Sequence, residues 1–283
     1  MIVTAQQHFV NVPLALLPER AALLLEAMKA SDLGEFAPFR ARLDPAPAAA
    51  LGQDAYTRDE QRPYSVIDGI AVIVVRGVLV HQRSWWFDET CYADIRRAFV
   101  MALDDAKVRA IVLHVNSPGG VVSGCFDLAD LIFVNRGKKP IWSILDEHAY
   151  SAAYALSCAA DRIIVPRTGG SGSIGVIMLR IDVTAMWEKF GVKVETIKFG
   201  AQKDDYYPTT PLSKDARDRM QAEVDAMGEM FVEMVARNRK MTASAVRKTE
   251  AGIFLGSAGV DQGLADAVMS PDEAFIALRD KIS

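Results

Sequence analysis

Ser151 opens the segment SAAYALSCAA, residues 151–160, and is the first candidate for covalent chemistry in this chain. A serine at the start of a helix is a good N-cap, so a purely structural role is the simplest interpretation of Ser151 taken alone. The same position can also hold a nucleophile. A nucleophilic serine needs a nearby group that accepts its proton, and the sequence must supply that group.

The four histidines are poor partners for Ser151. His148 lies three residues upstream, and a side chain at that place in a turn seldom reaches a serine hydroxyl in the right direction. His114 falls inside a predicted buried strand, and His8 and His81 lie away from the predicted loops. A histidine-dependent triad is therefore weakly supported.

Lys203 is the alternative proton acceptor, in the loop KFGAQKDDYYP, residues 198–208. A lysine acts as a base only when it is neutral, and desolvation is needed to lower its pKa from about 10.4 toward neutrality. Asp204 and Asp205 adjoin Lys203 in the chain, and nearby anions have the opposite effect on a lysine. From spacing alone, a solvated surface lysine is the favoured interpretation.

Two glycine-containing segments add candidate backbone donors. In NSPGG, residues 116–120, Gly119 and Gly120 leave N–H groups unobstructed, which suits an oxyanion hole, although a tight strand-to-helix turn explains the pattern equally well. GSGSIG, residues 170–175, matches GxGxxG formally, but a strand pattern follows it where a dinucleotide site needs a helix. We interpret this segment as a hydroxyl-rich support in which Ser173 can hydrogen-bond a neighbouring lysine.

The elements that must position these residues alternate between strand and helix from residue 69 onward. Strands are predicted at 69–80, 110–115, 141–145, 162–165, 175–183 and 192–197, and helices at 92–105, 124–135, 151–160 and 213–239. A short strand and helix follow within 252–268. This order predicts an α/β fold with a mostly parallel sheet, in which chemistry gathers in loops 116–120, 146–151 and 167–174 after the strands.

The first 64 residues look different from the rest. Residues 14–30 have helical periodicity, and residues 39–64 mix Pro, Ala and charge without a sustained period. We therefore predict an N-terminal helical appendage and linker over residues 1–64 and a catalytic domain over residues 65–283.

Composition excludes several classes of function. The net charge of −4 offers no basic surface for nucleic acid. Cys91, Cys125 and Cys158 are widely spaced, which favours buried reduced thiols over a disulfide or a metal site. No signal peptide is recognisable, and no apolar run approaches the roughly 20 residues of a membrane anchor. We expect a cytoplasmic protein.

Five segments together resemble the Ser–Lys peptidases of the signal peptide peptidase A and phage capsid-maturation protease (protein C) family. In chain order they are NSPGG, AYSAAYALSCAADRIIV, GSGSIGVI, FGAQKDD and GIFLGSAGVDQGLADAV. The resemblance covers roughly residues 65–270. It implies a ClpP/crotonase-like α/β fold of repeated ββα units and serine endopeptidase activity with no cofactor and no metal.

The resemblance also implies roles for individual residues. It calls for a nucleophile, a general base, a hydroxyl that orients the base, and backbone N–H groups that form an oxyanion hole. The implied nucleophile is Ser151, the implied base is Lys203, and the implied orienting hydroxyl is that of Ser173. The implied oxyanion donors are the N–H groups of Gly119 or Gly120 together with Ala152.

The partners implied are a peptide or protein substrate and further copies of the chain in a ring. The lysine loop is closest to the phage and prophage branch, which implies capsid-assembly substrates such as a portal or scaffold protein, in the host cytoplasm or the procapsid. Two alternatives stay open: a signal-peptide-peptidase-like cytosolic enzyme, and a non-catalytic assembly protein that kept the fold. The joint presence of Ser151, Lys203, Ser173 and the glycine pair argues against the second.

Overall fold

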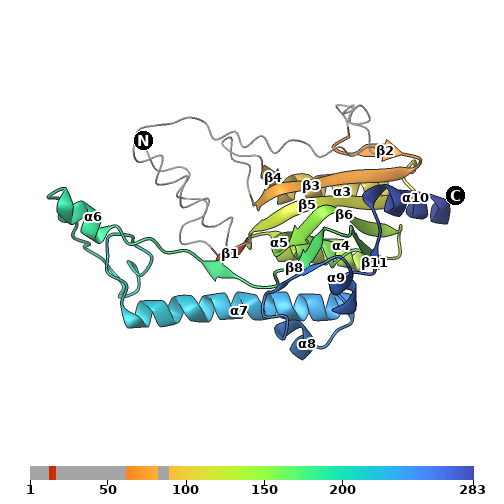
Figure 1. Ribbon diagram of the computed structural model, residues 1–283. Coiled ribbons are helices and arrows are strands. Elements are labelled where there is room, and N and C mark those ends of the chain that lie inside the picture. Colours follow the sequence, from red (N-terminus) through yellow and green to blue (C-terminus); the bar gives the residue numbers. More distant parts are fainter. Residues whose placement is uncertain (1–12, 17–61, 82–88) are drawn as a thin grey trace.

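The computed structural model describes residues 13–16, 62–81 and 89–283, with the backbone alone for residues 14–16. Its strands join in one sheet that carries helices on both faces (Figure 1). The strands are β1 Pro13–Leu16, β2 Ser65–Ile67, β3 Ile70–Val80, β4 Glu89–Cys91, β5 Ala110–Val121, β6 Ile141–Tyr150, β7 Arg162–Val165, β8 Gly170–Gly172, β9 Ile177–Met178, β10 Ile253–Leu255 and β11 Ala267–Val268. The helices are α3 Tyr92–Asp104, α4 Cys125–Val134, α5 Ala152–Ser157, α6 Thr184–Lys189, α7 Lys214–Arg239, α8 Ala243–Arg247, α9 Ser257–Asp261 and α10 Pro271–Ile282.

The centre of the sheet is parallel. Strand β5 pairs in parallel with β3 along one edge and with β6 along the other, and β6 pairs in parallel with β7 and β8. Antiparallel pairing is confined to β1, β2, β9 and β10 at the margins. The predicted mostly parallel α/β architecture is confirmed.

The two faces of the sheet are buried by different helices, because successive residues of a strand point to opposite sides. Helix α10 covers one face through Ala274, Phe275 and Leu278, which pack on Ile70, Val72, Ala110, Val112, Trp142, Ile144 and Ile164. Helices α3, α4, α5 and α7 cover the other face, where the largest buried side chains include Phe99, Ile111, Leu113, Ile132, Tyr154 and Phe231. Among the described helices, none is both long and apolar enough to cross a membrane.

Most predicted helices and buried strands are present, and the differences fall near the candidate site. Strand β5 continues to Val121 and β6 to Tyr150, so the predicted loops 116–120 and 146–150 are the ends of strands. The strand predicted at 175–183 shrinks to β9, and that predicted at 192–197 does not form. Residues 192–197 are exposed and lie beside no strand that would bury their apolar side chains.

The helix predicted over residues 14–30 is wrong for residues 14–16, which belong to strand β1. Strand β1 pairs with β5 and with β9 in the same sheet as the rest of the fold. The remainder of that predicted helix, and the predicted linker up to residue 61, lie outside the described residues.

Between β9 and α7 the chain leaves the body of the molecule. Helix α6 and the segments on either side of it extend beyond the end of the sheet, away from α5 (Figure 1). Arg180 holds the base of this segment, here called the arm (residues 179–213), by donating hydrogen bonds to the carbonyls of Tyr207 and Thr210. The Val183 N–H also donates to the Pro208 carbonyl at 2.9 Å.

Arg136 fixes the helix that follows Ser151. Its guanidinium donates to the carbonyls of Cys158, Ala159 and Ala160 just after α5, and to the Asn238 carbonyl of α7. The planar fork of an arginine suits several carbonyls at once, and each hydrogen bond from a charged group contributes about 1.5–3 kcal/mol.

Arg136→Met should therefore lower the free energy of unfolding by about 2–4 kcal/mol, because several buried carbonyls lose their donor. Urea denaturation followed by circular dichroism measures the change. Arg237→Met is the matched control: Arg237 pairs with Asp130 in a half-exposed position, and its loss should cost about 1 kcal/mol or less. Equal losses for the two variants would contradict this role of Arg136.

Candidate active site

Ser151 occupies a one-residue reversal between β6 and α5. Its backbone has φ 55° and ψ −120°, in a region where residues other than glycine are strained. The Ser151 N–H donates to the Gly172 carbonyl at 2.9 Å, and the Ser151 carbonyl accepts from the Ala155 N–H at 2.9 Å. The side chain is almost fully buried, at 1% exposure. A strained serine on a sharp strand-to-helix turn is how several hydrolase folds present a nucleophile.

The Ser151 hydroxyl does not cap α5, which rules out the simplest structural explanation of this residue. The hydroxyl instead donates to the Gly175 carbonyl across 3.4 Å, a long hydrogen bond. The first N–H groups of a helix have no acceptor within the helix, so the Ala152 N–H is free of intrahelical bonding beside the hydroxyl. Nucleophile and backbone donor are thus adjacent, as an oxyanion hole requires.

The glycine pair lies on β5, close to where β6 ends. Ser117 pairs with Ala149 of β6, and the Ser117 hydroxyl accepts from the Gly119 N–H at 3.1 Å while donating to the Gly77 carbonyl at 2.7 Å. Gly120 cannot carry a side chain, since a Cβ there would lie 1.8 Å from the Leu79 carbonyl oxygen. The close approach of β3 therefore requires a glycine at position 120.

The segment around Ser173 wraps the other side of Ser151. Gly172 has φ 112° and its carbonyl accepts from the Ser151 N–H, while Ser173 has φ 56° and donates its N–H to the Gly252 carbonyl at 2.8 Å. Gly175, two residues on, supplies the carbonyl that faces the Ser151 hydroxyl. The structure therefore gathers Ser151, Ala152, the glycine pair and the Ser173 segment at one end of the parallel strands.

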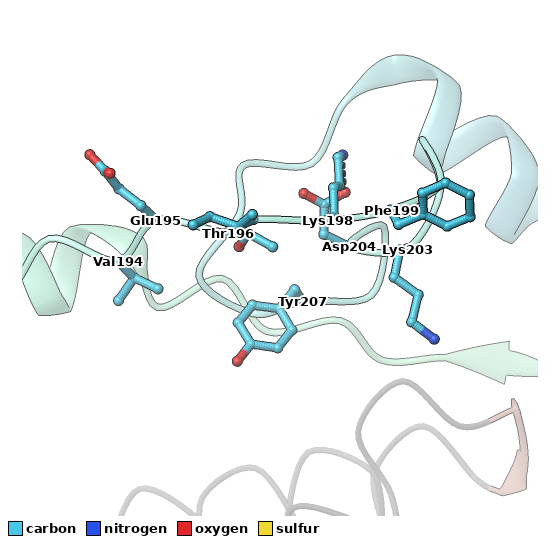
Figure 2. Close-up of a pocket in the computed structure, with 9 residues that line it drawn as sticks. Val194, Glu195, Thr196, Lys198, Phe199, Lys203, Asp204 and Tyr207 are labelled. Atoms are coloured by element: carbon cyan, nitrogen blue, oxygen red, sulfur yellow. Dashed lines mark hydrogen bonds and ion pairs between the residues drawn. The ribbon is translucent and has the colours of Figure 1, made fainter.

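Lys203 does not lie with this group of residues around Ser151. It lies exposed in the arm between α6 and α7, on a hollow lined also by Lys198, Phe199, Asp204 and Tyr207 (Figure 2). Figure 2 shows its ammonium pointing away from the other side chains of the hollow. Within the described part of one chain, Lys203 is not brought to the Ser151 hydroxyl.

The two aspartates beside Lys203 are committed to other cations. Asp204 forms an ion pair with Lys198, and Asp205 accepts from Arg219 at 2.7 Å. The hydrogen bond from Arg219 lowers the pKa of the Asp205 carboxyl below its ordinary value. Within the described residues neither carboxylate is paired with Lys203.

Two of the histidines, His114 and His148, lie in strands of the sheet, and His8 lies outside the described residues. His114 lies in the buried middle of β5, with its Nε2 3.9 Å from Asp146 Oδ1, and burial lowers its pKa despite the nearby Asp146. His148 lies in β6 rather than in a turn, and its ring stacks on Tyr150 with the centroids 4.9 Å apart.

The three cysteines are free and buried, as predicted. Burial raises the pKa of Cys125 to about 12 and that of Cys158 to about 11, so both stay protonated and unreactive at neutral pH. Within residues 62–81 and 89–283 no cluster of three potential metal ligands occurs.

A parallel α/β sheet whose strand ends present a strained serine among backbone donors is the arrangement of a serine hydrolase. Comparison with known proteins identifies the family: the model of Peptidase family S49 matches residues 134–282, more than half of the chain, and this chain belongs to that family. The matched region includes Ser151, Ser173 and Lys203 but not the glycine pair. With the parallel sheet, membership confirms the predicted ClpP/crotonase-like fold class.

Individual relatives agree with this family. The chain is 36% identical over 236 residues to the head-tail preconnector protein GP5 of Enterobacteria phage P21, covering 81% of this chain and 47% of the relative. It is 35% identical over 236 residues to the capsid assembly protease C of Escherichia phage lambda, covering 82% and 54%. A putative signal peptide peptidase SppA of Enterococcus faecium is 31% identical over 178 residues, covering 62% and 52%. The chain thus spans about half the length of the curated relatives it matches.

Two groups near Ser151, the Gly175 carbonyl and the Ser117 hydroxyl, were not predicted from the sequence. The Gly175 carbonyl could not be found, because any residue supplies a carbonyl and only the fold selects which one faces Ser151. Ser117 stands inside the NSPGG segment, and its position two residues before Gly119 was the available signal. A hydroxyl near a glycine pair can bond the backbone and so fix the direction of the peptide.

Gly120→Ala should destabilise the fold by roughly 1–3 kcal/mol, because the added methyl group overlaps the β3 backbone and must displace it. Thermal and urea unfolding measure this loss. Gly228→Ala in α7 is the control, since a Cβ there meets nothing within 4 Å, and it should be neutral or stabilising by about 0.5–1 kcal/mol. A Gly120→Ala protein as stable as the unmodified chain would show that β3 does not require this glycine.

Proposed function

We propose that this chain is a serine endopeptidase that uses a Ser151–Lys203 dyad and no cofactor. The observation that carries the proposal is the strained, buried Ser151 whose hydroxyl is not used as a helix cap. Neutral Lys203 accepts the Ser151 proton as Oγ attacks the substrate carbonyl. The protonated lysine then gives a proton to the leaving amine, and water hydrolyses the acyl-enzyme.

The backbone supplies the stabilisation of charge. In the proposed mechanism the Ala152 N–H, next to Ser151 at the start of α5, donates to the developing oxyanion, and a donor from the Gly119–Gly120 strand completes the hole. Loss of one such donor typically raises the barrier by about 3–4 kcal/mol. The Ser173 hydroxyl orients the lysine ammonium once the lysine has reached the site.

Lys203 is supplied to Ser151 by a neighbouring copy of the chain in a homo-oligomeric ring. The arm that carries it extends away from its own α5 and exposes large apolar side chains, with Ile197 and Phe199 fully exposed and Phe190 largely so. Large apolar side chains that stay this exposed are candidates for an interaction surface. Burial of the arm against a second copy also favours the neutral form that a lysine base needs.

The substrates proposed are capsid-assembly proteins such as a portal or scaffold protein, cleaved in the host cytoplasm or the procapsid. Support comes from the two phage relatives, which share more identity with this chain over more of its length than the putative signal peptide peptidase does. A signal-peptide-peptidase-like role is the alternative, and its substrates would be short hydrophobic peptides.

Ser151→Ala and Lys203→Met should each lower peptide hydrolysis at least 1,000-fold while leaving the unfolding transition in place, because each removes one member of the dyad. Cleavage of a denatured protein and of a fluorogenic peptide library measures activity. Lys193→Met is the matched control, an exposed arm lysine paired with Glu195, and should retain activity. Full activity in Ser151→Ala would refute the mechanism.

The origin of the lysine is tested by mixing the two inactive variants. In a ring where each site takes Ser151 from one copy and Lys203 from the next, random mixing regenerates about a quarter of the sites. Subunits of Ser151→Ala and Lys203→Met are mixed, allowed to exchange, and assayed for peptide hydrolysis. Each variant treated in the same way without the other is the control. A mixture that exchanges subunits but stays inactive would place both residues of the dyad in one chain.

A further inference from the structure

Strand β1 occupies the edge of β5 that adjoins Ser151. Because β5 pairs with β3 along one edge from Ala110 to Gly120, with one irregularity after Asn116, β6 and β1 must share the opposite edge. Strand β6 holds that edge as far as the Ser117–Ala149 pair, and β1 holds it from Gly119 to Val121. Ser151 follows Ala149 by two residues, at the junction where one strand leaves and the other begins.

The direction of β1 is that of a peptide entering the site. Its pairing with β5 is antiparallel, with Leu14 opposite Val121 and Leu16 opposite Gly119, so the chain runs toward the Ser151 junction. On its other edge β1 pairs antiparallel with β9, and among the described strands β9 pairs with β1 alone. The short strand therefore fills a slot one strand wide between the glycine strand and β9.

The pairing commits backbone groups that a substrate would need. The Val122 N–H donates to the Pro13 carbonyl at 3.2 Å. Successive peptides of a strand face opposite edges, so Ala15, two residues after Pro13, turns its backbone toward β5 and stands opposite Gly120. An extended peptide that adds to a sheet edge gains its affinity from these same backbone groups.

We propose that Pro13–Leu16 is an intramolecular occupant of the peptide-binding slot and holds the enzyme in an autoinhibited state until a substrate displaces it. This inference rests on the proposed peptidase function. The slot is one strand wide, and β1 fills it antiparallel to both neighbouring strands. Because this occupant belongs to the same chain, it competes with every substrate regardless of protein concentration.

Ala15→Pro tests the inference, because proline removes the N–H that faces β5 and weakens the occupant without touching the slot. Loss of about one backbone hydrogen bond should raise kcat/KM for a peptide about tenfold. Ala15→Ser keeps the N–H and should give a much smaller increase. An unchanged or lower kcat/KM in a folded Ala15→Pro protein would overturn the proposal.

A second variant holds β1 in place. Leu14→Cys with Val121→Cys creates a directly opposed antiparallel pair that a disulfide can bridge. The oxidised protein should lose at least tenfold in kcat/KM and regain it on reduction, because the occupant can no longer leave. Oxidised protein as active as reduced protein would show that substrate does not use this slot.

Peptide binding separates this inference from the proposed function. In the Ser151→Ala background a fluorescent peptide with the sequence of residues 11–18, NVPLALLP, should bind the Ala15→Pro protein about tenfold more tightly than the Ala15 protein. If this difference in binding is found, but no protein with an intact active site hydrolyses a peptide, the peptidase proposal is wrong and the proposal of an occupied slot stands. Equal binding by the two proteins would defeat the occupied slot, whatever the activity.

Discussion

The reversal of the chain at Ser151 is the constraint on which the rest of the site depends. A single residue converts strand β6 into helix α5, and it does so in a backbone conformation that costs about 1–3 kcal/mol. The strain is held by hydrogen bonds on both sides of the residue, from the Ser151 N–H to Gly172 and from Ala155 to the Ser151 carbonyl. The hydroxyl takes no part in these two bonds and instead makes the long hydrogen bond to the Gly175 carbonyl.

The surrounding elements are arranged so that this conformation persists. Helix α5 is completely buried against the sheet, and Arg136 ties the carbonyls after it to α7. Glycines stand where strands pass too closely for a side chain, as Gly120 does beside β3. The surroundings of Ser151 are therefore densely packed, whereas the arm that carries Lys203 lies apart from them and exposes apolar side chains. This separation is the reason for proposing that a second copy completes the site.

Much of the fold could be predicted from the sequence, because buried parallel strands and amphipathic helices have strong and distinct periods. Strand ends were less predictable: Asn116–Gly120 and Asp146–Tyr150 carry polar and glycine residues typical of loops, yet pairing with neighbouring strands keeps them extended. The strand expected at 192–197 failed for the opposite reason, since its apolar residues have no neighbouring strand in the described chain.

The site was predictable in part. Ser151 and the glycine pair follow buried strands of a parallel sheet, so their convergence could be expected. The Ser151–Lys203 pairing came from resemblance, and it stays a proposal because one chain does not bring the two together. Strand β1 could not be predicted, because residues 14–16 open a segment with helical periodicity and only their pairing with Gly119–Val121 makes them a strand.

The central claim, that Ser151 is the nucleophile, is tested most directly by trapping the acyl-enzyme. The protein is mixed with an activated peptide ester, quenched in acid during turnover, digested, and mapped by mass spectrometry. The account predicts an acyl group esterified to Ser151 and a loss of that adduct in Ser151→Ala. An adduct on another residue, or hydrolysis that continues in Ser151→Ala, would contradict it.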